Sequence, residues 1–254
     1  MKLKLIAAAV ALVASGSSFA FISGPQDGGA EMFLTVWQQS GTGTGSANRS
    51  FTFDLGVTLV DMVANQNTNL FINTVTSGSA EWTSFLAGGT GGTLQYSVVA
   101  GDMTDAVNPI LVSTFAANTI APKSGLDVYN AMDQIQQYTG SNNATGTHGS
   151  VANGVSFNTS GFEYYMTAAS NTWNGSTGNN SNAIGTAMIF GEMVAPDLAH
   201  AVTKVYAGKM LFAQQGSDYV LQYQVQAVPE PTGIALALAG FGIVGFVARR
   251  RKSA

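Results

Sequence analysis

Four glutamates in the body of the chain could supply the acid and the base of glycoside cleavage. They are Glu31, Glu81, Glu163 and Glu192. Glycoside hydrolases place two carboxyl groups on either side of the bond they cleave. Glu163 and Glu192 form the better pair, because both lie in strand-like runs with aromatic residues nearby, although the sequence gives no distance between them. A secreted polysaccharide-active hydrolase is therefore one hypothesis for this chain.

Other catalytic chemistry finds little support. The chain has no cysteine and two histidines, which excludes thiol catalysis and disfavours the usual ligand sets of zinc. Neither a G-x-S-x-G nor an H-E-x-x-H motif is present. His148 lies in the glycine-rich stretch 145–149 and is expected to be solvated on a loop, whereas His200 is expected to pack against or cap a short turn. We expect a protein that is not an enzyme.

The candidate sites for metal ions and phosphates are weak. Asp102 with Asp105, and Asp54 with Asp61, could offer carboxylate oxygens to calcium, but the spacing of a calcium-binding loop is missing. The glycine runs at 41–45 and 88–92 lack the lysine and the strand-to-helix setting of a phosphate loop. We predict solvated turns and loops at these positions, with no cofactor and no metal.

The body, residues 21–227, has mainly the pattern of β-strands. Short apolar or alternating runs rich in β-branched and aromatic residues occupy Glu31–Gln38, Phe51–Leu55, Thr93–Ala100, Ile110–Phe115, Gly161–Thr167 and Thr186–Met193. Alternation from Tyr219 to Val225 predicts a last strand, joined to an upstream strand by a turn at 215–218. This pattern favours a β-sandwich or jelly-roll-like body.

One or two short helices are expected on the connections of that body. Ser124 could cap a helix together with Asp127, and Gly140 lies near its expected end. The segments Leu59–Asn65 and Glu81–Leu86 fit a helix or a strand equally well.

The charge of the body limits its partners. From Phe21 to Val228 there are 13 acidic and four basic residues, a formal charge of −9. This balance argues against nucleic acid and anionic lipid as partners. Without cysteine, the stability of an exported body rests on packing alone. The surface polarity comes mainly from neutral residues, which suits contact with hydrated polymers such as exopolysaccharide.

The N-terminus has the three regions of a secretory signal peptide. Lys2 and Lys4 precede an apolar run from Leu5 to Ala14, and small residues follow. Ser18 and Ala20 occupy the positions that signal peptidase requires, which predicts removal of residues 1–20.

The C-terminus combines an extended motif, an apolar segment and a basic cluster. Val228-Pro229-Glu230-Pro231 precedes an uncharged run of 16 residues, 233–248, that would rise about 24 Å as a helix. The cluster Arg249, Arg250, Arg251 and Lys252 follows and predicts a cytoplasmic tail with the body outside. We therefore predict a single transmembrane helix at 233–248.

Residues 228–252 resemble the PEP-CTERM sorting signal in the order and chemistry of these three parts. The resemblance implies processing by exosortase, a membrane-embedded transpeptidase of Gram-negative bacteria that make exopolysaccharide, with removal of the tail. It covers about a tenth of the chain and implies nothing about the body.

Three hypotheses follow for the body. The first is a noncatalytic structural or adhesive β domain of a biofilm-associated protein. Such a protein is exported across the inner membrane, held there transiently and delivered to the cell surface or the extracellular matrix. The second is a carbohydrate-binding module, with Trp37, Trp82 and Trp173 as the candidate row of exposed aromatic residues. The third is the hydrolase described above. The expected partners are exosortase, signal peptidase and the inner membrane, with exopolysaccharide as a further candidate.

Overall fold

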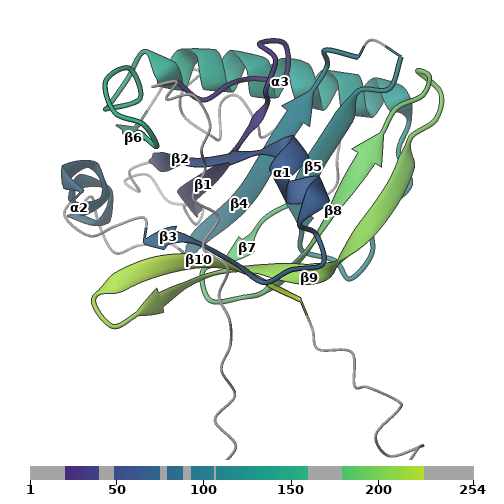
Figure 1. The fold of residues 1–254 in the computed structure, drawn as a ribbon. Helices are drawn as coiled ribbons and strands as arrows, with labels where there is room; N and C mark the ends of the chain where they lie inside the picture. Colours follow the sequence, from purple (N-terminus) through teal and green to yellow (C-terminus); the bar gives the residue numbers. More distant parts are fainter. Residues whose placement is uncertain are drawn as a thin grey trace, which may run out of the picture.

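A computed structural model describes residues 21–39, 49–74, 79–87, 93–105, 107–159 and 179–225 (Figure 1). The strands are β1 (Glu31–Gln39), β2 (Ser50–Thr58), β3 (Leu70–Thr74), β4 (Thr93–Asp102), β5 (Ile110–Phe115), β6 (Val155–Asn158), β7 (Asn182–Ala183), β8 (Met188–Val194), β9 (Val202–Gln215) and β10 (Asp218–Val225). The helices are α1 (Leu59–Ala64), α2 (Ala80–Ala87) and α3 (Gly125–Asn143).

All the described strands belong to one antiparallel sheet. Its order is β3-β10-β9-β8-β5-β4-β1-β2-β6, and β7 pairs with β4 beside that path. The prediction of a mainly β body is confirmed, but the two-sheet sandwich is wrong for the described residues. Register shifts in the β1–β2, β8–β9 and β10–β3 pairs allow the sheet to bend. Because the sheet curls, apolar residues from its different strands pack against one another, as residues from two separate sheets do in a sandwich.

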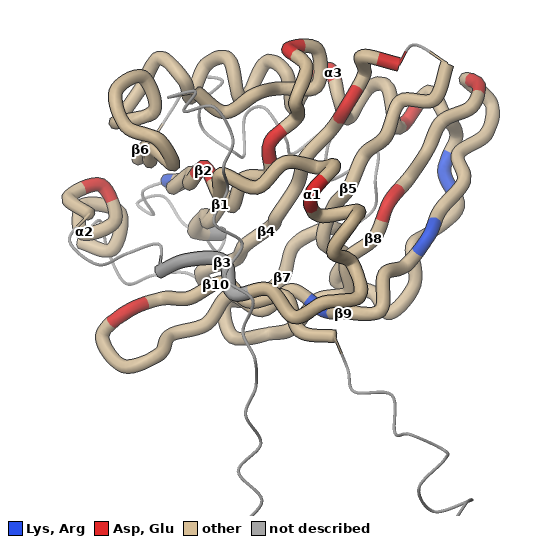
Figure 2. Tube along the Cα trace, viewed as in Figure 1, with Lys and Arg blue, Asp and Glu red and all other residues tan. Residues whose placement is uncertain are grey.

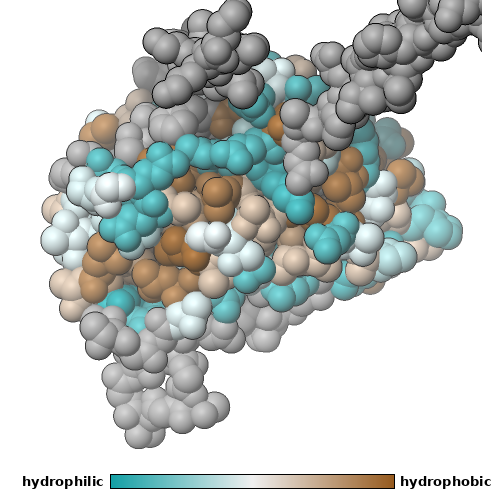
Figure 3. Space-filling model, turned by 90° about the horizontal axis from the view of Figure 1, so that it is seen from below, coloured by the Kyte–Doolittle hydropathy of each residue, from teal (hydrophilic) through white to brown (hydrophobic). Residues whose placement is uncertain are grey.

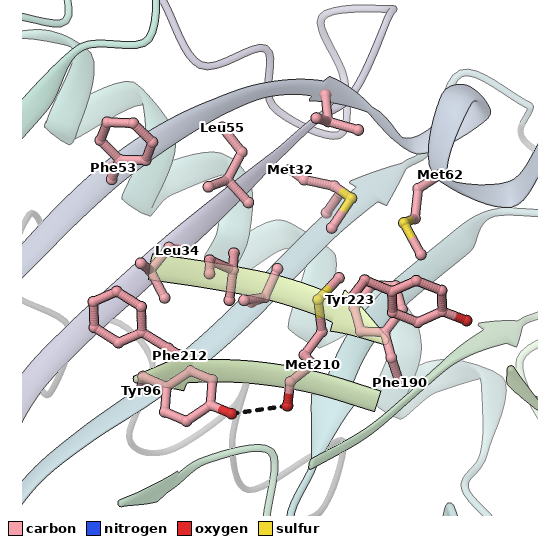
Figure 4. Packing of buried hydrophobic residues seen from close by; sticks show 14 of the residues in the cluster. Met32, Leu34, Phe53, Leu55, Met62, Tyr96, Phe190, Met210, Phe212 and Tyr223 are labelled. Atoms are coloured by element: carbon pink, nitrogen blue, oxygen red, sulfur yellow. Dashed lines mark hydrogen bonds between the residues drawn. The ribbon is translucent and has the colours of Figure 1, made fainter. Parts of the chain in front are cut away.

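The inner side of the curl holds the larger core. Met32 and Leu34 from β1, Phe53 from β2, and Phe212 and Tyr223 from β9 and β10 meet in one buried cluster (Figure 4). Intervening β1 residues such as Phe33 point to the other face, where α3 contributes Val128, Met132, Ile135 and Tyr138 to a second cluster. Because both faces of β1 are covered, its sequence is nearly continuously apolar.

Helix α3 begins as the sequence predicts. The Ser124 hydroxyl accepts from the Asp127 amide, and the Asp127 carboxylate accepts from the Ser124 amide in return. The helix ends at Asn143, so Gly140 lies near its end as predicted. The two ambiguous segments are helices α1 and α2.

The predicted terminal hairpin is confirmed as β9 and β10. Gln215 pairs with Asp218 across the turn, and Gly216 has a φ of 66°, a conformation that favours glycine. In the residues that the structure describes, no helix combines the length and apolar character needed to cross a bilayer. The predicted transmembrane helix 233–248 lies outside them.

Candidate functional site

The residues predicted to direct sorting lie outside the described residues. These are Ser18 and Ala20, the motif Val228, Pro229, Glu230 and Pro231, and the cluster Arg249, Arg250, Arg251 and Lys252. The structure does describe the stem from which the motif leaves the body. That stem is the end of β10, which stops at Val225, three residues before Val228.

The end of β10 is held by hydrogen bonds on both sides. The Val225 amide donates to the Asn69 side chain at 2.7 Å, on the side of β3. The Tyr223 hydroxyl accepts from the Gly208 amide at 2.9 Å and donates to the Gln66 carbonyl. Tyr223 is fully buried, so its ring fixes the strand in the core. The motif therefore starts from a firmly positioned strand.

Beside this stem, part of β9 has a strand on one side only. Its pairing with β10 ends at Gly208, whereas its pairing with β8 extends to Val202. Among the described residues, no strand pairs with the other side of residues 202–207. Val202 is 61% exposed and Val205 46% exposed.

His148 is buried, which corrects the prediction of a solvated loop residue. Its Nε2 lies 3.2 Å from the Ser156 hydroxyl, which donates to Oδ1 of Asn142 at 2.6 Å. Since the serine proton goes to Asn142, Nε2 is the donor to Ser156, and His148 is not arranged as a base for this serine. Burial lowers the pKa of His148 to about 4. The Thr147 amide donates to the Val155 carbonyl, and this contact across the loop carries His148 into the interior.

His200 behaves as predicted, as a residue that closes a turn. Its amide donates to the Asp197 carboxylate at 2.8 Å, and its ring Nδ1 lies 3.1 Å from the same oxygen. Both side chains are exposed.

Glu192, one member of the proposed acid/base pair, is engaged in local contacts. It accepts a hydrogen bond of 2.6 Å from Tyr206 and lies 3.8 Å from the Lys204 ammonium. Burial and this carboxylate raise the pKa of Tyr206. Glu163 lies outside the described residues. Of the two glutamates, the structure therefore describes only Glu192, whose carboxylate contacts Tyr206 and Lys204.

Asp54, a candidate calcium ligand by its sequence, is a buried carboxyl group. It is 1% exposed and accepts a hydrogen bond of 2.9 Å from the Gly56 amide. Burial raises its pKa to about 7, with a further contribution from nearby Glu31. Burial also raises the pKa of Glu31, against the hydrogen bond from the Ser23 amide. The position of Asp54 within the apolar run Phe51–Leu55 is the feature of the sequence that could have predicted its burial.

The remaining candidates form no site in the described residues. Asp102 accepts from the Thr104 amide in a turn, and no group of three potential metal ligands occurs in the described part of the chain. Trp37 and Trp82 are 2% and 3% exposed. Trp173 and both glycine runs lie outside the described residues.

Comparison with known proteins identifies the C-terminal region alone. A family model for the PEP-CTERM protein-sorting motif matches residues 227–252. No curated protein and no solved structure matches this chain. The chain thus carries the sorting motif of exosortase substrates, behind a body that resembles no protein in these comparisons.

Proposed function

We propose that this protein is exported to the cell surface or extracellular matrix as an exosortase substrate, and that its body is a noncatalytic structural or adhesive domain. The motif at residues 227–252 carries this proposal, because it supports export and sorting. The matched region begins at residue 227, and β10 ends at Val225. The hydrogen bonds of Tyr223 with Gln66 and of Val225 with Asn69 hold the end of that strand. A short link of this kind keeps the body close to the membrane until the tail is removed.

The surface of the body supports a role among neutral polymers. Acidic residues are spread over the described chain, and basic residues are few (Figure 2). Seen from below, apolar residues lie between stretches of hydrophilic ones (Figure 3). Burial of Trp37 and Trp82 disfavours the carbohydrate-binding module with an aromatic row, and the contacts of Glu192 disfavour a hydrolytic pair.

Sorting is tested by following the body in cells with and without exosortase. Wild-type protein should reach the surface, where added protease digests it. When exosortase is absent, it should keep its C-terminal tail and remain in the inner membrane. Leu238→Asp places a charge at the centre of the predicted helix, at a cost of about 2.5–3.5 kcal/mol of insertion free energy. That variant should leave the inner membrane unretained and unclipped. Identical fractionation of all three would refute the proposal.

The role of the body is tested on the surface protein itself. A structural or adhesive domain predicts that loss of the protein weakens retention of cells in their own exopolysaccharide, and that the purified protein releases no sugar from that polymer. Release of reducing ends by the purified protein would replace this proposal with the hydrolase.

A further inference from the structure

We infer that the fold sets the order of the export steps, because signal peptidase can remove residues 1–20 only before the segment 21–27 docks on helix α3. This rests on the proposed export, for which the sequence predicts cleavage after Ala20. It goes further by stating when that bond is open to the enzyme. The hydrogen bonds of the segment, the burial of Ile22 and the separation of the partners along the chain carry the inference.

Ile22 is the second residue after the predicted cleavage site, and its backbone is held at both polar groups. Its amide donates to Oδ1 of Asn143 at 2.8 Å, and its carbonyl accepts from Nδ2 of the same side chain at 3.0 Å. The Ile22 side chain is fully buried in the second cluster, which also contains Ile135 and Tyr138 of α3. Ile22 is therefore part of the core, and Phe21 alone separates it from the bond to be cleaved.

The residues that follow are held in the same way. The amide of Ser23 donates to the Glu31 carboxylate at 3.0 Å, and its carbonyl accepts from the Glu31 amide at 3.0 Å. The Gln26 amide donates to the Gln136 side chain of α3 at 2.8 Å. A Cβ added to Gly24 would lie 2.5 Å from Oε1 of Gln136, so the segment runs directly against the helix. The backbone of the segment is thus engaged in contacts with the body.

A protease gains no access to a bond beside a chain held in this way. A protease that binds its substrate as an added strand needs free backbone groups on both sides of the bond. In a folded protein, such access requires local opening of the segment. For the bond after Ala20, opening breaks both hydrogen bonds to Asn143 and brings Ile22 out of the core. The folded precursor should therefore resist signal peptidase.

The position of Asn143 in the chain leaves time for cleavage before docking. Asn143 is the last residue of α3 and lies 121 residues after Ile22. Its side chain can bind Ile22 only after this length of chain has crossed the membrane, because a contact of such separation requires the intervening chain to be ordered. Until then the segment has no partner on α3, and the bond is open to the enzyme.

A missed cleavage should therefore persist. A precursor that folds first keeps the apolar run from Leu5 to Ala14, because the docked segment protects the bond after Ala20. It stays attached to the inner membrane by its N-terminus, whether or not exosortase removes the tail. Only chains that are cleaved before α3 forms are released to the surface.

Cleavage of the folded precursor by purified signal peptidase tests this inference. The full-length chain is prepared from cells in which signal peptidase is inhibited, and is folded in detergent micelles. Asn143→Ala removes both hydrogen bonds to Ile22 and should raise the cleavage rate about tenfold above wild type. Gln137→Ala is the matched control, because this exposed side chain bonds with Asp133 of the same helix. It should leave the rate unchanged.

A spacer variant separates access to the bond from general unfolding. An inserted Gly-Ser-Gly-Ser between Phe21 and Ile22 moves the bond away from the docked segment and leaves the hydrogen bonds of Ile22 in place. Its unfolding free energy in urea should match that of wild type, whereas its cleavage should be at least as fast as that of Asn143→Ala. Cleavage of the folded wild-type precursor at the rate of the spacer variant would overturn the inference. A spacer variant that resists the enzyme would contradict the predicted cleavage site itself, and the inference with it.

Discussion

The indole of Trp82 in α2 lies edge-on against the ring of Tyr219 in β10, with the ring centroids 5.1 Å apart. The same indole meets Phe51 of β2 at 4.9 Å. Strands β2 and β10 lie next to the two ends of the sheet. Trp82 therefore joins the two ends of the curl from inside, and the short helix α2 acts as a structural bridge.

Replacing Trp82 with Ala should destabilise the protein by about 3–5 kcal/mol, because it removes a buried aromatic side chain and leaves a cavity. Leu86→Ala is the matched control on the same helix, since Leu86 is 39% exposed and should change stability far less. Urea unfolding followed by circular dichroism measures both. Equal losses would show that the bridge has no special role.

Two glycines of α3 should respond to alanine in opposite directions. Gly140 has open space around it, so Gly140→Ala should stabilise the protein by about 0.5–1 kcal/mol through helix propensity. A Cβ at Gly125 would overlap the backbone oxygens of Asp197 and His200, so Gly125→Ala should destabilise it by about 1–3 kcal/mol. Thermal unfolding measures the two shifts. A stabilising Gly125→Ala would contradict the close approach of the 197–200 turn to the helix.

Asp54 should make the protein less stable as the pH rises. Its pKa is raised from 3.8 to about 7 in the folded state, so its contribution is complete below pH 3.8 and is lost as the pH approaches 7. Asp54→Asn should remove this loss, which is on the order of 4 kcal/mol. The difference in unfolding free energy between variant and wild type, measured at pH 4 and pH 8, isolates this residue. A difference that does not vary with pH would contradict a buried, protonated Asp54.

His148 should act in the opposite direction. Its pKa falls from 6.5 to about 4 on folding, so its contribution is present above pH 6.5 and is lost as the pH falls to 4. The loss is on the order of 3 kcal/mol. His148→Gln should abolish it and keep a donor for Ser156, whereas the exposed control His200→Gln should retain it. Retention of the acid-dependent loss in His148→Gln would show that this histidine is not its source.

Local patterns predicted the elements well but not their assembly. Alternation in β10 and the Ser124–Asp127 cap are readable because they depend on neighbours in sequence. The single curled sheet depends on which strands pair, and apolar runs such as β1 do not reveal this. His148 was misplaced because its burial comes from the contact of Thr147 with Val155 across the loop. The sorting motif can be recognised without knowledge of the fold, because the order of prolines, apolar segment and cations along the chain identifies it.

The masses of the two ends of the mature surface protein test the central claim most directly. Export and exosortase sorting predict an N-terminus at Phe21 and a C-terminus at or near Val228–Pro231, without the cluster Arg249–Lys252. Mass spectrometry of protein recovered from the cell surface reports both ends at once. An intact chain from Met1 to Ala254, found in the cytosol, would contradict the account.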